Sequence, residues 1–361
     1  MFLALREFKH AKLRFLLISL IMILISFLVL FVSGLAKGLS FDNASSIDSM
    51  ASNYFVLQKE SGKQINHSML TEKQINEVQK LAGEKNSTTL GVQMTTFLKE
   101  GTSKKIDATI FGIDVNGIAA PKIIEGKMIN NTTTNEVVGD ISLKEKGIQI
   151  GDSITDQISG KEFKLVGFTE NQSYSHAPVI HVNYKEWPLL NRQNSFNTIA
   201  LKTNEFTAKK INEKVSGVEV INKKQALKGI PGYKEEQGSL LMMIVFLFFI
   251  GAFVLAVFFY IITIQKINQF GVLKAIGSKT SYLAKNIIFQ VLTLTLFSLI
   301  ISISITFGLS KVLPAGLPFV FDAQLIIGSS LLFLFVAIVG SLISLLKVVK
   351  IDAIEAIGRA F

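Results

Sequence analysis

The sequence predicts a membrane protein with four transmembrane α-helices, one before and three after a large extracytoplasmic α+β domain. Four apolar stretches of 22–25 residues lack Lys, Arg, Asp and Glu: Phe15–Ala36, Leu240–Ile264, Ile287–Leu309 and Leu325–Leu346. At about 1.5 Å per residue, each can cross a hydrocarbon core of about 30 Å. A composition that is 49% hydrophobic agrees with this class of protein.

Charge is distributed unevenly along the chain. The segments 1–14, 265–286 and 347–361 hold 11 basic and 3 acidic residues, whereas region 37–238 holds 25 basic and 23 acidic residues. Short basic segments stay in the cytoplasm. Both termini and segment 265–286 are therefore predicted to be cytoplasmic. The net charge of +10 is a topology signal and does not indicate binding to nucleic acid.

These patterns divide the chain into nine segments. They are a cytoplasmic amphipathic helix at 1–14, a first span at 15–36, an extracytoplasmic domain at 37–238, a second span at 239–264, a cytoplasmic segment at 265–286, a third span at 287–310, an outer loop at 311–322, a fourth span at 323–346 and a cytoplasmic tail at 347–361. The first span is too long for a signal-peptide core, so a retained anchor is expected. The chain has no cysteine, which excludes disulfides and thiolate metal sites.

The polar region alternates helical and strand patterns. A helix is expected in 68–82, with a capping-type Thr-Glu-Lys-Gln beginning at Thr71, and another in 206–215. Strands are expected at 54–58, 92–98, 108–113, 136–138, 163–168 and 179–182. The segment GIPGYKEEQG at 229–238 leads back to the membrane.

Small residues recur at helical spacing along the apolar stretches. The stripes are Ser19/Ser26/Ser33, Gly34/Gly38, Ser298/Ser302 and Gly340/Ser344. Small residues let membrane helices approach closely. They can serve packing within the chain, but four spans make a thin bundle, so at least one stripe is expected to form a homodimer seam.

Several chemistries are absent from the sequence. No apolar stretch carries an ionisable residue, which argues against ion-coupled transport. The segment from Gly271 to Thr280 resembles a phosphate-binding loop only superficially, because five residues separate its glycines and Ser278 stands where the lysine belongs. No catalytic signature and no metal site are predicted, so the chain is not expected to be an enzyme.

The basic segment 265–286 offers a docking element instead. Its helical pattern makes Phe270, Leu273 and Ile276 available to enter the groove of a partner. The alternative is a solvated loop that faces lipid headgroups. An apolar edge exposed to the cytosol favours docking.

Four features in order resemble MacB/FtsX-type ABC transporter permeases. They are the one-plus-three layout, the phrase FGVLKAIG at 270–277, the tail KIDAIEAI at 350–357, and the stretch NEVVGDISLKEKGIQIGDSITDQISGKEFKLVGFTEN at 135–171. Two departures stand out: Gln269-Phe270 replaces an acidic residue before the glycine, and Asp352-Ala353 lacks the usual proline. The short length and the opening FLALREFKHAKLRF are most similar to haem-efflux permeases of the HrtB type from low-GC Gram-positive bacteria.

The resemblance implies a permease in a bacterial plasma membrane, a homodimer of this chain surrounded by lipid, driven by a separate cytosolic ATPase that binds the ATP. It implies no intrinsic cofactor, and haem as the exported substrate. The ATPase contacts are expected at Phe270, Gly271, Leu273, Lys274, Ile276 and Gly277. Three alternatives remain: export of an antimicrobial or signalling peptide, an FtsX-like regulator that transports nothing, and an outside receptor or anchor.

A haem site is expected next to the outer membrane surface. Haem needs an apolar slot and one or two axial ligands, for which a phenol or an imidazole can serve. Tyr233 lies seven residues before the second apolar stretch, with Tyr174 and Phe55 expected as neighbours. His176 is the competing ligand. Each of these side chains can equally belong to the domain core.

Overall fold

The protein, a computed structural model that describes residues 12–190, 195–314 and 317–349, divides into two compact units. The first, here the helical bundle, comprises the described residues up to Gly38 and from Gly238 onward. The second, here the sheet domain, is Leu39–Gln237. Most of the amphipathic helix predicted at 1–14 and the whole tail motif at 350–357 lie outside the described residues.

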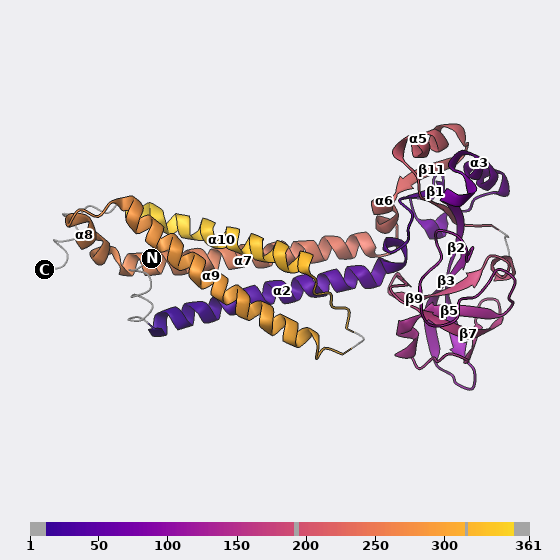
Figure 1. Cartoon of the computed structure of the whole chain (residues 1–361), viewed down its shortest axis with the longest axis horizontal. Coiled ribbons are helices and arrows are strands. Elements are labelled where there is room, and N and C mark those ends of the chain that lie inside the picture. The colour runs from indigo at the N-terminus through magenta and orange to yellow at the C-terminus, as the bar shows by residue number, and fades with distance from the viewer. Residues whose placement is uncertain (1–11, 191–194, 315–316, 350–361) are drawn as a thin grey trace. The chain divides into compact units, whose positions relative to one another are not determined.

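The helical bundle confirms the four predicted apolar helices (Figure 1). Its long helices are α2 (Lys12–Asp48), α7 (Tyr233–Gln265), α9 (Thr280–Ser310) and α10 (Ala323–Val349), with the short α8 (Ile267–Ala275) between α7 and α9. Within the described residues, these four are long and apolar enough to cross a membrane. Helix α2 continues to Asp48, well past the apolar stretch that ends at Ala36.

Several residues of the small-residue stripes make contacts within the chain. The hydroxyls of Ser26 and Ser302 lie 2.5 Å apart, and Ser302 also donates to the Ile23 carbonyl at 2.8 Å, so α2 and α9 pack closely. A Cβ at Gly38 would lie 2.1 Å from the carbonyl oxygen of Pro318, so that glycine is required. The expectation that at least one stripe forms a homodimer seam stays a prediction.

The sheet domain contains eleven described strands in one twisted arrangement. They are β1 (Tyr54–Gln58), β2 (Ser87–Lys99), β3 (Lys105–Ile113), β4 (Ile123–Gly126), β5 (Glu136–Asp140), β6 (Ser153–Asp156), β7 (Glu162–Thr169), β8 (Ser173–Tyr174), β9 (Ala177–Asn183), β10 (Thr198–Leu201) and β11 (Val218–Asn222). The order is β11-β1-β10-β2-β3-β9-β5-β7-β4, with β6 paired to β2 and β7, and β8 paired to β9. The β3–β9 and β5–β7 pairs are parallel.

Strand β6 closes part of this sheet into a ring. The pairings run β2-β3-β9-β5-β7-β6 and return to β2, which encloses an apolar core. Trp187 at the start of α4 (Trp187–Leu190) belongs to this core and is 1% exposed. Its ring lies where side chains at Gly91 and Gly112 would otherwise be.

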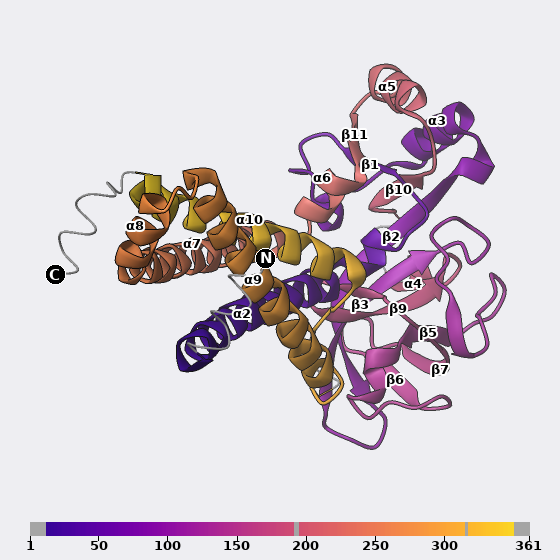
Figure 2. The same ribbon diagram turned by 60° about the vertical axis from the view of Figure 1, so that its left-hand side comes forward.

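The remaining strands form an open wing covered by helices. Helices α3 (Glu72–Ala82) and α5 (Glu205–Lys214) lie side by side over it (Figure 2), and a second apolar core lies between them and β1, β10 and β11. The predicted capping box is present, because the Thr71 hydroxyl accepts from the Gln74 amide while the Gln74 side chain accepts from Thr71 N. Helix α6 (Lys223–Lys228) leads from β11 towards α7.

Candidate functional site

The candidate site is built around the turn between β8 and β9. This two-residue turn, Ser175-His176, has positive φ at both positions, 53° and 59°. Such turns favour Asn and Gly, because most side chains clash in this backbone region. Ser and His here mark a strained turn that the surrounding structure holds in place. The turn presents the His176 imidazole to two helices.

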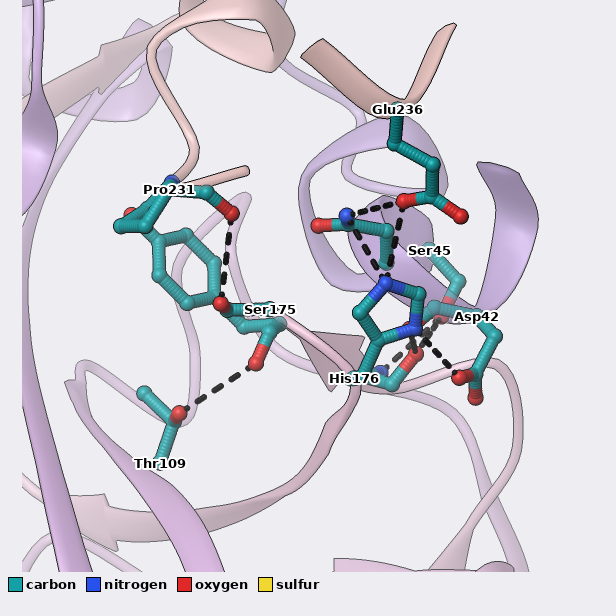
Figure 3. Close-up of polar contacts among 10 residues, drawn as sticks. Asp42, Ser45, Thr109, Ser175, His176, Pro231 and Glu236 are labelled. Atoms are coloured by element: carbon teal, nitrogen blue, oxygen red, sulfur yellow. Dashed lines mark hydrogen bonds and ion pairs between the residues drawn. The ribbon is translucent and has the colours of Figure 1, made fainter. Parts of the chain in front are cut away.

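His176 lies between two carboxylates (Figure 3). Its Nδ1 is 2.8 Å from Asp42 Oδ2 on α2, and its Nε2 is 3.0 Å from Glu236 Oε2 on the first turn of α7. The Asn43 amide donates to the same Glu236 oxygen at 2.7 Å. Glu236 therefore accepts from two sides, once from α2 and once from the turn.

The hydrogen bonding of His176 favours its doubly protonated form. An imidazole can donate to both carboxylates only when each ring nitrogen carries a proton. Burial lowers the pKa of His176, but its hydrogen bonds to Asp42 and Glu236 and the negative charges of these carboxylates outweigh burial, so the pKa is raised above its usual value. The cluster is a charge-assisted contact with a half-exposed imidazole at its centre.

Three of the predicted substrate residues meet in one apolar cluster of the sheet domain. Phe55 and Tyr174 are fully buried within it, and Tyr233 packs against it from the first position of α7. The Tyr233 hydroxyl lies 3.3 Å from the Ser40 hydroxyl. Burial raises the pKa of the Tyr174 phenol, which disfavours the phenolate that binds iron. Only Tyr233 is partly exposed here, so Phe55 and Tyr174 can support a ligand at Tyr233 but do not face one.

The predicted docking residues of α8 are not all accessible. Phe270 is 1% exposed and belongs to the apolar core of the helical bundle, and Gly271 is buried beside it. The expectation that Phe270 enters a partner's groove is therefore corrected: this ring anchors α8 to the bundle. Leu273 packs partly against the same core. Ile276, by contrast, is 75% exposed.

The end of α8 shapes what a partner can reach. Gly277 has a φ of 97°, and the chain turns there before α9 begins at Thr280. Val272 is 48% exposed, and the intermediate Lys274 lies two residues further along. Of the residues predicted to contact the ATPase, Lys274, Ile276 and Gly277 are therefore accessible, and the exposed Val272 precedes them in the chain.

The sequence alone did not reveal the polar residues that organise either region. Asp42, Asn43 and Glu236 lie 134, 133 and 60 residues from His176, and no local pattern connects them. In the bundle, the buried Lys266 donates to Gln290 at 3.1 Å, which ties the start of α8 to α9. These polar residues are identified only by their contacts in the folded structure.

The fold and these contacts define a class: a multi-pass membrane protein whose first and second apolar helices lead into and out of a sheet domain. Residues 241–353 match the family of FtsX-like permease C-terminal domains. Over the whole length, the chain is 32% identical to a protein of Staphylococcus haemolyticus (strain JCSC1435) and 32% identical to one of Staphylococcus epidermidis (strain ATCC 12228 / FDA PCI 1200), with 99% of each chain covered. Both carry the provisional name hemin transport system permease protein HrtB.

Two more distant similarities accompany these. An uncharacterised ABC transporter permease of Mycobacterium tuberculosis (strain ATCC 25618 / H37Rv) is 22% identical, with 99% of each chain covered. The solved extracellular domain of the noncanonic ABC-type transporter YknZ from Gram-positive bacteria is 15% identical, with a TM-score of 0.36, 47% of this chain and 99% of that chain covered. The chain belongs to the FtsX-like ABC transporter permeases of the HrtB type.

Proposed function

We propose that this chain is the permease subunit of an ABC-type exporter that removes haem from the bacterial plasma membrane. In this proposal the chain is a homodimer, a separate cytosolic ATPase supplies the energy, and both termini face the cytoplasm. The full-length similarity to two proteins that carry the name of hemin transport permeases is the observation that carries the proposal. The alternation of basic and near-neutral segments supports the orientation.

Tyr233 is the best-placed substrate contact in the sheet domain. It begins the helix that becomes the second apolar span, and amphipathic rings prefer the interface between membrane and water. Its ring packs on an apolar cluster that contains Phe55 and Tyr174, which suits the face of a porphyrin. A phenol oxygen is also a known type of axial ligand to ferric iron. His176 is the weaker candidate, because both of its ring nitrogens already contact carboxylates.

The surface of α8 is the proposed contact for the ATPase. Ile276 and Val272 are exposed apolar side chains on a segment whose neighbour Phe270 is fixed in the bundle core. A partner that binds Ile276 can therefore push on the bundle through a rigid anchor rather than through a loose loop. Apolar side chains that fill a partner's pocket commonly carry much of the binding energy.

A hemin titration tests the substrate. Purified full-length protein in detergent should give an absorbance band at about 400 nm on binding hemin. Tyr233→Phe removes only the phenol oxygen, so this variant should weaken or shift the band. Tyr184→Phe is the matched control, since Tyr184 is also exposed in the sheet domain. Cells that depend on this transporter should lose tolerance to hemin with the first variant alone. If the parent, Tyr233→Phe and Tyr184→Phe bind hemin equally and give equal tolerance to it, peptide export or regulation becomes the better explanation.

Cysteine labelling tests the orientation in a chain that has no native cysteine. A cysteine at the exposed Lys63 should react with a membrane-impermeant maleimide in intact cells, whereas one at Ser278 should react only after lysis. Lys63 is the better reporter than the nearby Ser61, which is buried. The reverse pattern would contradict the proposed topology and with it the cytosolic ATPase.

A further inference from the structure

The outer part of α2 is fastened to the β8–β9 hairpin through backbone groups. Ser175 N donates to the Asn43 carbonyl at 2.7 Å, and Ser173 N donates to the Ser45 hydroxyl at 2.9 Å. The Ser173 hydroxyl in turn donates to the Asp42 carbonyl. The first of these bonds joins two backbone groups, and each of the other two has one backbone partner. The outer turns of α2 and the hairpin therefore form one rigid piece.

The first turn of α7 is held to that piece mainly through side chains. The contacts converge on Glu236, whose Oε2 lies 2.7 Å from Asn43 Nδ2 and 3.0 Å from His176 Nε2. Two longer contacts accompany them: Tyr233 to Ser40 at 3.3 Å, and the Ser175 hydroxyl to the Pro231 carbonyl at 3.4 Å. One rotation of the Glu236 side chain removes the two shortest contacts together.

A hinge precedes this attachment by four residues. Gly232 has a φ of 78°, and an added Cβ there would meet no atom within 4 Å. Before the hinge, Ile230 is buried in the domain core, and Lys223 of α6 donates to the Asp48 and Met50 carbonyls at 2.9 and 2.7 Å. The chain is therefore fixed before Gly232. After it, Tyr233 N donates to the Ile230 carbonyl at 3.1 Å across the glycine, and side chains make the contacts to α2 and the hairpin.

When Glu236 leaves, His176 keeps its second carboxylate partner, and Asn43 Nδ2 keeps its 3.1 Å contact to His176 Nε2. The His176 Nδ1 contact to Asp42 at 2.8 Å lies entirely on the α2 side, so the imidazole keeps one carboxylate partner. Glu236 itself is 20% exposed and can be hydrated once it turns outward. Release consequently does not bury an unpaired charge, which is the usual obstacle to breaking an ion pair inside a protein.

We propose that Glu236 is a releasable clasp, and that the first turn of α7 pivots at Gly232 away from the outer turns of α2 and the hairpin when Glu236 leaves His176 and Asn43. The motion separates Tyr233 from Ser40 and so opens the position at which substrate is proposed to bind. The access of substrate rests on the proposed function, whereas the hinge and the clasp do not. His176 and Asn43 are positioning residues that hold α7 closed between transport events.

A reporter at Ser40 tests the clasp without any substrate. In the full-length protein in detergent, Ser40→Cys places a thiol beside Tyr233, and its rate of reaction with a maleimide reports how far α7 has moved. Adding Glu236→Ala should raise that rate several-fold, and Glu236→Gln, which keeps the shape but loses the charge, should raise it less. Glu235→Ala is the control, because it removes the same charge one residue away. Fluorescence of the buried Trp187 verifies that each variant is folded.

A cross-link separates this inference from the identity of the substrate. Asn43→Cys with Glu236→Cys, joined by a short bis-methanethiosulfonate reagent, should trap α7 and make cells retain hemin until a reductant cleaves the link. Ser45→Cys with Ser173→Cys, whose native hydroxyls are 2.9 Å apart, should form a disulfide that leaves export intact, because these parts move together. Unchanged Ser40→Cys labelling in Glu236→Ala would overturn the clasp. If Glu236→Ala raises the labelling of Ser40→Cys as expected, but the link between Asn43→Cys and Glu236→Cys does not affect hemin export, the clasp is supported and hemin is rejected as the substrate.

Discussion

Acid should destabilise the sheet domain through a single buried histidine, His181. This residue lies on β9 opposite Val138 of β5, is fully buried, and packs edge-on to Phe111 with ring centroids 5.9 Å apart. Burial lowers the pKa of His181 from 6.5 to about 3, and the backbone of Val138 offsets this only in part. The native domain therefore holds this imidazole neutral at a pH where the unfolded chain protonates it.

The sign and size of the effect follow from linkage. Below pH 6.5, His181 binds a proton in the unfolded state but stays neutral in the folded state. The free energy of unfolding therefore falls as the pH falls. At about 1.36 kcal/mol per pKa unit, acidification to about pH 5 costs about 2 kcal/mol from His181 alone. For a domain of roughly 200 residues this is a fall in melting temperature of about 4–8 °C. The loss ceases to grow near the folded pKa of about 3.

The chain supplies its own assay, because its one tryptophan, Trp187, is buried in the core of the same domain. Melting curves followed by tryptophan fluorescence at about pH 7.5 and about pH 5 should show the predicted drop in the parent. His181→Leu should show a drop smaller by about 2 kcal/mol, whatever its stability at neutral pH. His67→Asn, at an exposed position, should behave like the parent. An equal drop in His181→Leu and in the parent would refute the reasoning.

Three further outcomes are expected. For His176 the pH dependence of stability has the opposite sign, because its pKa is raised in the folded domain. Its contacts stabilise the domain fully below the ordinary histidine pKa, and this stabilisation is lost as the pH rises through the raised pKa. His176→Gln should lose this dependence in the same melts. Phe270→Ala should destabilise the helical bundle by about 3–5 kcal/mol in detergent melts, whereas Ile276→Asp should leave the melt unchanged and abolish co-purification of the ATPase. Gly38→Ala should lower the yield of folded protein, because its Cβ would meet the Pro318 backbone, while Gly328→Ala, which meets no atom within 4 Å, should be neutral in size-exclusion chromatography.

Local sequence patterns were sufficient to predict the long apolar helices, the start of α3 and the longer strands. Apolar length identified the four long helices, and the Thr71 capping box located the start of α3. The six predicted strands correspond to β1, β2, β3, β5, β7 and β9. Short strands such as β6 (Ser153–Asp156) and β10 (Thr198–Leu201) were not predicted, because four residues carry too little periodicity, and β6 matters only through its non-local pairing with β2 and β7.

Hydrophobicity also could not mark where α2 ends. Its apolar stretch stops at Ala36, but the helix continues to Asp48, since no proline interrupts it and its polar groups find partners in the sheet domain. Those extra turns carry Asp42, Asn43 and Ser45, the residues that contact the hairpin. The sequence indicated which residue types were present, but not that they meet, because the contacts join parts of the chain more than a hundred residues apart.

The burial of Phe270 changes how force can pass through this protein. If Phe270 were exposed, its side chain could insert into the ATPase, and shortening that side chain would weaken only the contact with the ATPase. A buried one makes α8 part of the bundle core, together with Phe15 of α2 and Phe259 of α7. Displacement of α8 by a partner must then repack the ends of α2 and α7 that lie in that core. The same two helices lead to Asp42 and to Glu236 at their far ends. The proposed ATPase contact and the proposed clasp thus act on one pair of helices, so a variant such as Phe270→Ala is expected to weaken hemin tolerance even where Ile276 still binds the ATPase.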